Sequence, residues 1–344
     1  MLPFDPPLEP MLAEASEDLP EGEGWVYEPK WDGFRAIVFK DGDAVHLCSR
    51  SGQPLQRYFP EVVEALVRLL PERCILDGEL ILPGPKGLDF DALQARLHPA
   101  ASRVARLARE TPAGFTAFDL LALGDEDWRG RRTDQRREGL LGVMPVGPTY
   151  FPTPRTASPE EARRWFEEFE GAGCDGLIAR RVELPYAPGK RVLVKVKHHR
   201  TADVVVGGYR EGKTPGTVGA LLLGVYDGQG AFHHLGHTSS FSAKEKRALF
   251  EQLQPLRTQA SFDERIPDAP SRWQAARETP WTPVEPRLVC EVRFDAMQGP
   301  RFRHATTFQR WRVDKAPLEC TFAQLEPPRP FSLERIVALA TAGT

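Results

Sequence analysis

The sequence of 344 residues predicts an α+β domain over residues 1–200 and an all-β barrel with one helix over residues 201–344. Before residue 200, strand-like segments alternate with helices that are bounded by proline and glycine. After it, short strands are joined by Gly-rich turns. The pattern changes within the segment KHHRTAD, so we expect the domain boundary near residues 198–203.

The first domain is predicted to contain antiparallel sheets with flanking helices. Apolar and polar residues alternate through residues 33–52 on both sides of Asp41-Gly42, a dipeptide typical of a hairpin turn. Ser158 and Glu161 have the spacing of a capping box and mark the start of the clearest helix. Another helix is expected over residues 60–71, and further strands over 74–82, 114–123, 174–181 and 191–198.

The second domain resembles a small Greek-key barrel in its element pattern. Ser242 and Glu245 again have capping-box spacing, and they begin a helix that we expect over residues 241–256. Several short strands and a single helix in this length are typical of an OB-fold, which is the fold we predict. The strands are expected over residues 204–212, 219–230, 231–240 and 287–299.

The composition is that of a soluble globular protein, with a net charge of −3. This charge argues against a protein that simply coats nucleic acid, although it permits a local basic track. The five cysteines are scattered without metal-binding spacing, and the acidic, proline-rich N-terminus does not resemble a signal peptide. We therefore expect a cytoplasmic protein that has no membrane partner.

Charged residues occur at places where a plain turn or a buried strand does not explain them. A carboxylate within an apolar run is costly to bury unless it is paired or bound to a metal. Two lysines two positions apart on a strand point to one face and repel each other unless an anion lies near both. The segments are EPKWDGFR with Glu28, Lys30, Asp32 and Arg35, ILDGEL with Asp77 and Glu79, CDGLIARR with Asp175 and Arg180, and VLVKVKH with Lys195 and Lys197.

Several carboxylates together with several fixed cations match the needs of a metal–polyphosphate site. The chain has no Walker-type loop and no G-x-G-x-x-G at the start of a helix, so a nucleotide would not be held by a Gly-rich loop. A lysine nucleophile is the alternative, and Lys30 is the candidate. Because free lysine is protonated at neutral pH, we expect Lys195, Lys197 and Mg²⁺ to lower the pKa of Lys30.

Seven segments in order resemble those of the covalent nucleotidyltransferase superfamily, and specifically ATP-dependent DNA ligases. The resemblance extends from about residue 25 to residue 317 and is greatest to the small bacterial repair type, ligase C and the ligase domain of ligase D. It implies a nucleotidyltransferase (adenylation) domain followed by an OB-fold domain. The segments are EPKWDGFR, SRSG, ILDGEL, FTAFDLL, CDGLIARR, VLVKVKH and RFRHATTFQRWRVDK.

The resemblance also implies roles for individual residues. Lys30 would become adenylated, Glu28 would help to recognise adenine, and Phe118 would stack on it. Asp175 stands where the family usually has a metal-binding Glu, and its side chain is one methylene shorter. The other ATP- or AMP-binding residues would be Arg35, Arg50, Glu79, Arg180, Lys195 and Lys197. The metal ligands would be Glu79, Asp175 and Asp32. Pyrophosphate would be oriented by Arg310, Arg312, Asp314 and Lys315.

The implied activity is ATP-dependent sealing of nicks in duplex DNA through a covalent lysyl-AMP, with Mg²⁺ or Mn²⁺ and in the service of DNA repair. We expect a monomer in the bacterial cytoplasm, associated with the nucleoid while acting, with repair proteins as partners and a hinge near residues 198–203. One alternative is an RNA ligase or another covalent nucleotidyltransferase, such as a capping guanylyltransferase. A different class of alternative is an inactive DNA-binding protein that contains an OB-fold.

Overall fold

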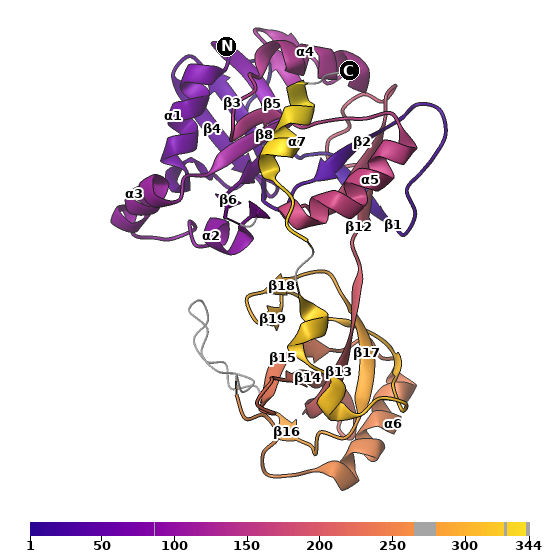
Figure 1. Cartoon of the computed structure of the whole chain (residues 1–344). Helices are drawn as coiled ribbons and strands as arrows, with labels where there is room; N and C mark the ends of the chain where they lie inside the picture. The colour runs from indigo at the N-terminus through magenta and orange to yellow at the C-terminus, as the bar shows by residue number, and fades with distance from the viewer. Residues whose placement is uncertain (86, 265–279, 327–328, 342–344) are drawn as a thin grey trace. The chain divides into compact units, whose positions relative to one another are not determined.

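The computed structural model divides the chain into two compact units (Figure 1). The first comprises Met1–His198 and Pro328–Thr344, and the second comprises His199–Pro327. The expected second domain, residues 201–344, differs from the second unit because its C-terminal end belongs to the first. The structure describes residues 1–85, 87–264, 280–326 and 329–341.

The first unit contains two main sheets whose facing sides carry the functional segments. One sheet has the strand order β1-β12-β11-β2, and the other has the order β10-β8-β5-β3-β4, with β9 beside β8. An apolar cluster that includes Ile37, Ile75 and Leu121 from one sheet and Leu193 from the other joins the facing sides. The strands are β1 (Leu12–Ser16), β2 (Trp25–Lys30), β3 (Phe34–Asp41), β4 (Ala44–Ser49), β5 (Arg73–Ile81), β8 (Gly114–Leu123), β9 (Glu126–Asp127), β10 (Tyr150–Pro152), β11 (Gly176–Arg181) and β12 (Arg191–Lys197), with a short ribbon of β6 (Pro83–Gly84) and β7 (Gly87–Leu88).

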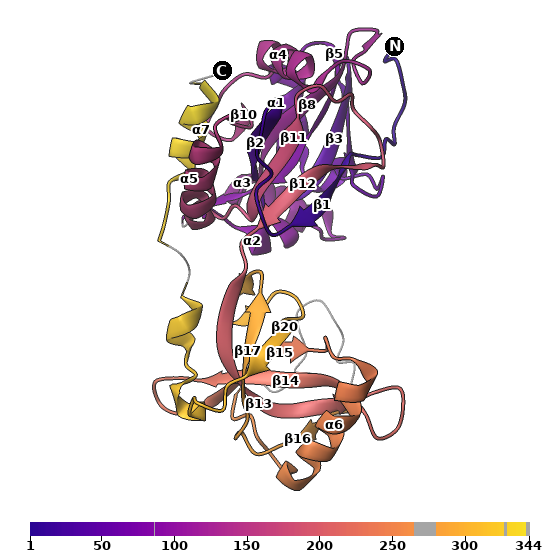
Figure 2. The ribbon, with the colours of Figure 1, turned by 90° about the vertical axis from the view of Figure 1, so that its right-hand side faces the viewer.

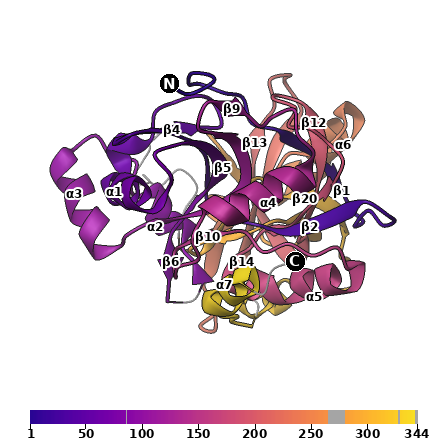
Figure 3. The ribbon, with the colours of Figure 1, turned by 90° about the horizontal axis from the view of Figure 1, so that it is seen from above.

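Figures 1 and 3 show α1 and α3 together at one end of the unit, and Figure 3 shows α5 and α7 along a different edge. None of the helices in the described ranges could span a membrane. The helices are α1 (Pro60–Leu69), α2 (Phe90–Gln94), α3 (Ala101–Glu110), α4 (Thr133–Val143), α5 (Pro159–Phe169) and α7 (Leu333–Thr341), and short 3₁₀ turns cover Gln56–Tyr58 and Glu170–Ala172.

The predicted helix starts are confirmed, with one difference in detail. Ser158 accepts a hydrogen bond from the backbone N–H of Glu161 and so caps α5. The Glu161 carboxylate, however, accepts a hydrogen bond from the Thr156 hydroxyl at 2.7 Å. This contact to the preceding loop replaces the bond from the Ser158 backbone N–H that a complete capping box would have. In the second unit, Ser242 and Glu245 form both halves of the box.

The two Asp-Gly dipeptides near the N-terminus have different structures. Asp41-Gly42 connects β3 and β4 as a hairpin, and Gly42 has a φ of +61° that favours glycine. Asp32-Gly33 lies at a bend between β2 and β3, which belong to different sheets. A Cβ on Gly33 would collide with the carbonyl oxygen of Leu80. The bend is therefore a crossing between sheets that only glycine fits.

The second unit is a small barrel whose strand order β15-β14-β13-β17-β20 agrees with the predicted OB-fold. A further bridge between Thr238 and Thr306 brings the end of β15 next to the start of β20. Its elements are β13 (Arg200–Glu211), β14 (Val218–Tyr226), β15 (Phe232–Thr238), α6 (Ala243–Leu253), β16 (Thr282–Pro283), β17 (Val289–Phe294), β18 (Met297–Gln298), β19 (Arg301–Phe302) and β20 (Thr307–Trp311), with 3₁₀ turns at Gln254–Leu256, Pro317–Glu319 and Phe322–Leu325.

Helix α7 belongs to the first unit because its apolar side is buried there. Ile336, Val337 and Ala340 join the hydrophobic cluster that contains Trp165 and Phe169 of α5. Figure 2 shows α5 and α7 along the same side of the unit. The chain thus leaves the first unit after β12 and returns to it for its last helix, which the expected boundary of residues 201–344 did not include.

Replacing Ile336 with alanine tests this docking. The fully buried Ile336 side chain leaves a cavity on truncation, so Ile336→Ala should lower the free energy of unfolding of the first unit by about 2–4 kcal/mol. Denaturant unfolding, combined with hydrogen exchange of the α7 amides, measures this. Glu334→Gln on the exposed side of α7 is the control and should change it by less than about 0.5 kcal/mol. Equal effects of the two substitutions would show that α7 is not docked.

Candidate active site

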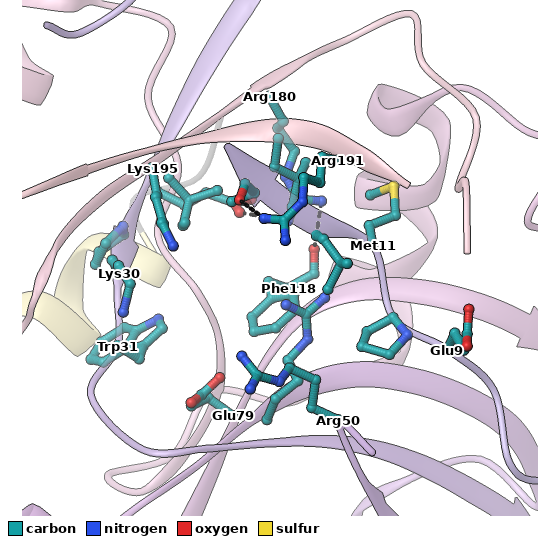
Figure 4. Close-up of a pocket in the computed structure, with 18 of the residues that line it drawn as sticks. Glu9, Met11, Lys30, Trp31, Arg50, Glu79, Phe118, Arg180, Arg191 and Lys195 are labelled. Atoms are coloured by element: carbon teal, nitrogen blue, oxygen red, sulfur yellow. Dashed lines mark hydrogen bonds and ion pairs between the residues drawn. The ribbon is translucent and has the colours of Figure 1, made fainter. Parts of the chain in front are cut away.

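A cavity of about 610 Å³ lies between the facing sides of the two sheets in the first unit (Figure 4). Lys30, Trp31 and Lys195 lie at one end of it, and Glu9 and Met11 lie at the other. Most of the residues predicted for the site contribute to its lining. These are Glu28, Lys30, Arg35, Arg50, Glu79, Phe118, Arg180 and Lys195.

The register of three neighbouring strands places the lysines. Lys30 of β2 and Lys197 of β12 both pair with Gly176 of β11, one on each side. Gly176 has a φ of +134°, and an added Cβ would collide with the carbonyl oxygen of Val196. The glycine therefore lets the three strands approach closely, and the two ammonium groups flank the residue that precedes it, Asp175.

The Asp175 carboxylate joins the two lysines. Its Oδ2 accepts a hydrogen bond from Lys30 Nζ at 2.7 Å and also forms an ion pair with Lys197 Nζ at 2.8 Å. Burial alone would raise the pKa of Asp175, but the charges and hydrogen bonds of these lysines outweigh it and lower the pKa below its usual value. Asp175 is thus an ionised group between two cations, although it does not line the cavity itself.

The pKa of Lys30 differs from the expectation that neighbouring cations lower it. Burial does lower it, but the charge and hydrogen bond of Asp175, with smaller contributions from Glu79 and Asp32, outweigh burial and raise the pKa. The pKa of Lys195, by contrast, is lowered by burial and by the charges of Lys197 and Lys30. Among these side chains alone, Lys30 is held as an ammonium ion.

Glu79 provides a carboxyl group whose protonation is balanced near neutral pH. Burial, with the negative charges of Asp77 and Asp32, raises its pKa to about 7 despite the opposing charges of Arg35 and Lys30. The predicted ligands Asp32, Glu79 and Asp175 do not form a ready metal cluster, and no group of three or more His, Cys, Asp or Glu side chains in the described ranges does. Hard carboxylate oxygens next to a cavity lined by Lys30, Arg35 and Lys195 nevertheless fit Mg²⁺, which commonly takes one or two carboxylates together with substrate phosphates.

Arg35 is held rigidly against the aromatic wall of the cavity. It donates two hydrogen bonds of 2.6 Å to Asp77, which also accepts one of 2.6 Å from the Tyr186 hydroxyl. The Arg35 guanidinium carbon lies 4.5 Å from the ring centroid of Phe118, which is a cation–π distance. Arg35 therefore supports Phe118 from one side while it contributes positive charge to the cavity.

Glu28 is the centre of a buried ion-pair network behind the cavity. Its carboxylate accepts hydrogen bonds from Arg155 and forms an ion pair with Arg180 at 2.9 Å. Arg180 also pairs with Asp119 at 3.0 Å. Asp119 in turn accepts two hydrogen bonds from Arg136 of α4. Removing one partner from such a buried pair typically costs about 3–5 kcal/mol, because the remaining charge is left unpaired.

The N-terminal segment forms a wall of the cavity that the sequence did not indicate. Glu9, Met11 and Ala13 are among the lining residues, and β1 pairs in parallel with β12. The backbone N–H of Met11 donates to the Tyr186 hydroxyl at 3.3 Å, which connects the segment to Asp77. Arg50 lies opposite, in the exposed turn after β4, where it contributes to the rim of the cavity.

The residues predicted to orient pyrophosphate lie in the second unit. Arg312 and Lys315 both bind the carboxylate of Asp203, with N–O distances of 2.8 Å. Arg312 also pairs with Asp314 at 2.8 Å, and Arg310 pairs separately with Glu291 of β17 at 2.7 Å. Asp203 thus orders the segment of Arg312 and Lys315 within the second unit. Asp203 was not among the predicted site residues.

Several supporting residues were missed in the sequence. Asp119 carried the same signal as Asp77, a carboxylate inside an apolar run, but the segment FTAFDLL drew attention to Phe118 instead. Arg155 follows a strand of three residues in a loop, so no periodicity marks it. The remaining supporting residues are Arg136, Tyr186, Asp203 and Glu291, together with the wall formed by Glu9, Met11 and Ala13.

Comparisons with known proteins agree with this geometry. The family model for the ATP dependent DNA ligase domain matches residues 10–197, and the model for the ATP dependent DNA ligase C terminal region matches residues 214–315. DNA ligase C2 of Mycolicibacterium smegmatis is 49% identical over 343 residues, 95% of this chain and 96% of that protein. DNA ligase C of Mycobacterium tuberculosis is 47% identical over 98% of each chain.

A solved structure from a study of Lig E DNA ligases supports the fold alone. It is 21% identical, has a TM-score of 0.55, and covers 88% of this chain and 99% of that one. The matched family models cover both units, and the two relatives named above span nearly the whole chain. This chain therefore belongs to the ATP-dependent DNA ligase family, with a nucleotidyltransferase domain followed by an OB-fold domain.

Proposed function

We propose that this DNA ligase seals nicks through a covalent intermediate on Lys30. The observation that carries the proposal is the position of Lys30, whose side chain lines the cavity beside the cations Lys195 and Lys197. In the first step, Nζ forms a bond to the α-phosphorus of ATP and the bond to the β-phosphate oxygen breaks, which releases pyrophosphate. AMP then passes to the 5′-phosphate of the nick, and attack by the 3′-hydroxyl joins the strands and releases AMP.

Positive charge at the cavity supports each of these phosphoryl transfers. Such reactions depend mainly on positioning and on stabilisation of charge on the phosphate oxygens. Lys195 points into the cavity from β12, Arg35 is fixed by Asp77, and Arg50 lies at the rim. We assign Lys195 and Lys197 to the α-phosphate and Arg50 to the 5′-phosphate of the nick.

A divalent cation, Mg²⁺ or Mn²⁺, would be held by Asp175 and Glu79, with Asp32 as a further carboxylate near Lys30. When bound, it would supply positive charge that offsets the charge of the phosphates. Asp175 is also the group that raises the pKa of Lys30. Since Lys30 must lose a proton before it attacks, any other cation that takes up the Asp175 carboxylate favours the reactive amine.

The base end of the cavity is assigned to adenine, with Phe118 for stacking and Glu28 for recognition of its edge. We assign Arg310, Arg312, Asp314 and Lys315 of the second unit to the orientation of the departing pyrophosphate. Because they belong to a different unit from Lys30, the proposal includes a change in the relation of the units between the ATP step and the sealing step.

A role in DNA repair is supported by a partial relative. The Multifunctional non-homologous end joining DNA repair protein LigD of Mycobacterium tuberculosis is 33% identical to this chain, which covers 37% of that protein. Duplex DNA with a nick is the proposed substrate. The monomeric state, the cytoplasmic location and the use of repair proteins as partners stay predictions.

Labelling with ATP tests the nucleophile directly. The wild-type protein, incubated with ATP radiolabelled at the α-phosphate and Mg²⁺, should retain the label after denaturation. Lys30→Ala should retain none, because no other amine occupies its position, whereas Lys190→Ala at an exposed position should label like the wild type. A wild-type protein that never carries a covalent label, or a labelled Lys30→Ala protein, would contradict the proposed intermediate.

The titration of Lys30 tests the role of Asp175. Asp175→Asn removes the largest influence that raises the pKa of Lys30, while burial, which lowers it, remains. The midpoint for Lys30 should therefore move to lower pH, as measured by the pH dependence of its acetylation with quantitative mass spectrometry. Asp32→Asn, which removes a weaker influence, should move it less. A larger shift in Asp32→Asn than in Asp175→Asn would contradict the assignment.

The second unit is tested by separating the ATP step from the sealing step. Arg312→Ala should slow formation of lysyl-AMP by about 10²-fold, as expected when a preorganised charge is lost from the departing group. Sealing of a nick that already carries 5′-linked AMP should stay within about threefold of the wild type, since pyrophosphate takes no part in it. An exposed lysine on α6, changed in Lys244→Ala, is the matched control. Equal slowing of both steps would overturn this assignment.

A further inference from the structure

Two arginines hold the carboxylate of Glu28, Arg155 through hydrogen bonds and Arg180 through an ion pair. A carboxylate offers about four hydrogen-bond acceptor sites, two on each oxygen. Arg155 donates to Oε1 from Nε at 2.9 Å and from Nη2 at 2.6 Å, so that oxygen is saturated. Arg180 Nη2 lies 2.9 Å from Oε2. Acceptor capacity therefore remains on Oε2, where Arg180 forms an ion pair but donates no hydrogen bond, and Glu28 is a lining residue of the cavity.

The backbone places Arg155 beside Glu28 from a distant part of the sequence. Tyr27 of β2 and Thr156 exchange backbone hydrogen bonds of 2.8 and 3.0 Å, which adds the loop after β10 to the edge of the strand that carries Glu28. The N–H of Thr153 donates to the carbonyl oxygen of Ala117 at 2.7 Å and fixes the start of the loop. Arg155 therefore approaches Glu28 from a rigid position outside the cavity lining.

The two arginines differ in how much they depend on Glu28. Arg180 divides its guanidinium between Glu28 and Asp119, and Asp119 is also held by Arg136. Arg155 directs two donors to Glu28, and the two side chains are only 8% and 3% exposed. In this buried setting, an arginine that holds one oxygen with two donors fixes the orientation of the carboxylate.

We infer that Arg155 is a positioning residue that sets the purine selectivity of the cavity. By saturating Oε1 and so leaving acceptor capacity only on Oε2, it favours a base that presents a donor there, such as the amino group of a 6-aminopurine. A 6-oxopurine would present lone pairs to the same oxygen. The inference rests on the proposed function, in which the cavity binds ATP and Glu28 meets the edge of the base.

The test compares ATP and GTP as substrates for the covalent labelling of Lys30. Arg155→Met keeps the length and apolar character of the side chain but removes the donors. It should raise the KM for ATP about tenfold and lower the ATP-to-GTP ratio of kcat/KM by about tenfold or more, while kcat with ATP stays within about threefold. Arg155→Lys, which keeps the positive charge but lacks the paired donors of the guanidinium, should give an ATP-to-GTP ratio between those of the wild type and Arg155→Met.

Two further comparisons isolate the action of Arg155. Arg164→Met makes the same chemical change at an exposed position of α5 and should leave the ratio unchanged. In a Glu28→Gln background, adding Arg155→Met should change the ratio by less than about twofold, because the group through which it acts is already altered. Thermal melting of each variant accompanies the kinetics, and if Arg155→Met does not fold, Arg155→Lys alone decides the result.

The outcomes separate the inference from the proposed function. Absence of covalent label in the wild-type protein would refute the proposed chemistry itself. Normal labelling of Lys30 with a wild-type ATP-to-GTP ratio in Arg155→Met, or in Arg155→Lys where only that variant folds, would overturn the role of Arg155. A change of ratio that is as large in the Glu28→Gln background as in the wild type would also overturn it, because Arg155 would then not act through Glu28.

Discussion

The single carboxylate of Asp175 makes the cluster of lysines at the edge of this cavity possible. Lys30 and Lys197 flank the same residue of the middle strand, and two ammonium groups at such separation repel each other unless an anion lies between them. Asp175 provides that anion, at 2.7 and 2.8 Å from the two nitrogens. The same contact raises the pKa of Lys30, so the interaction that assembles the cluster also restrains Lys30, the proposed nucleophile, until the carboxylate is engaged elsewhere.

Alternation along the strands explains why charge and apolar packing share the space between the sheets. Arg35, Ile37 and Phe39 point to one side of β3, and the last two belong to the apolar cluster that joins the sheets. Leu193 and Lys195 are related in the same way on β12. One part of the space between the sheets is therefore an ordinary hydrophobic core, and the adjoining part is the charged cavity. The close packing of the core holds the strands that line the cavity in place.

This alternation also determines how much could be predicted from the sequence. Lys195 and Glu79 lie on different strands, and in each strand the alternation of side chains from one face to the other places the residue. A local pattern was therefore enough to assign both residues to the sides of the sheets that line the cavity. The contacts of Arg155 to Glu28, and of Asp203 to Arg312 and Lys315, join segments more than 100 residues apart and leave no local pattern. The docking of α7 likewise depends on a surface made by α5, which its own amphipathic pattern cannot identify.

The docking of α7 changes how the two units can be related during catalysis. A hinge at residues 198–203 alone would leave the OB-fold unit attached at one end. Because Phe331 and the helix after it pack on the first unit, the OB-fold unit is connected to the first unit by the chain before it and by the chain after it. Any change in their relation must then be accommodated at both connections. The segment of Arg312 and Lys315 is already ordered by Asp203 within its own unit, so such a change would carry it as a preformed group rather than assemble it anew.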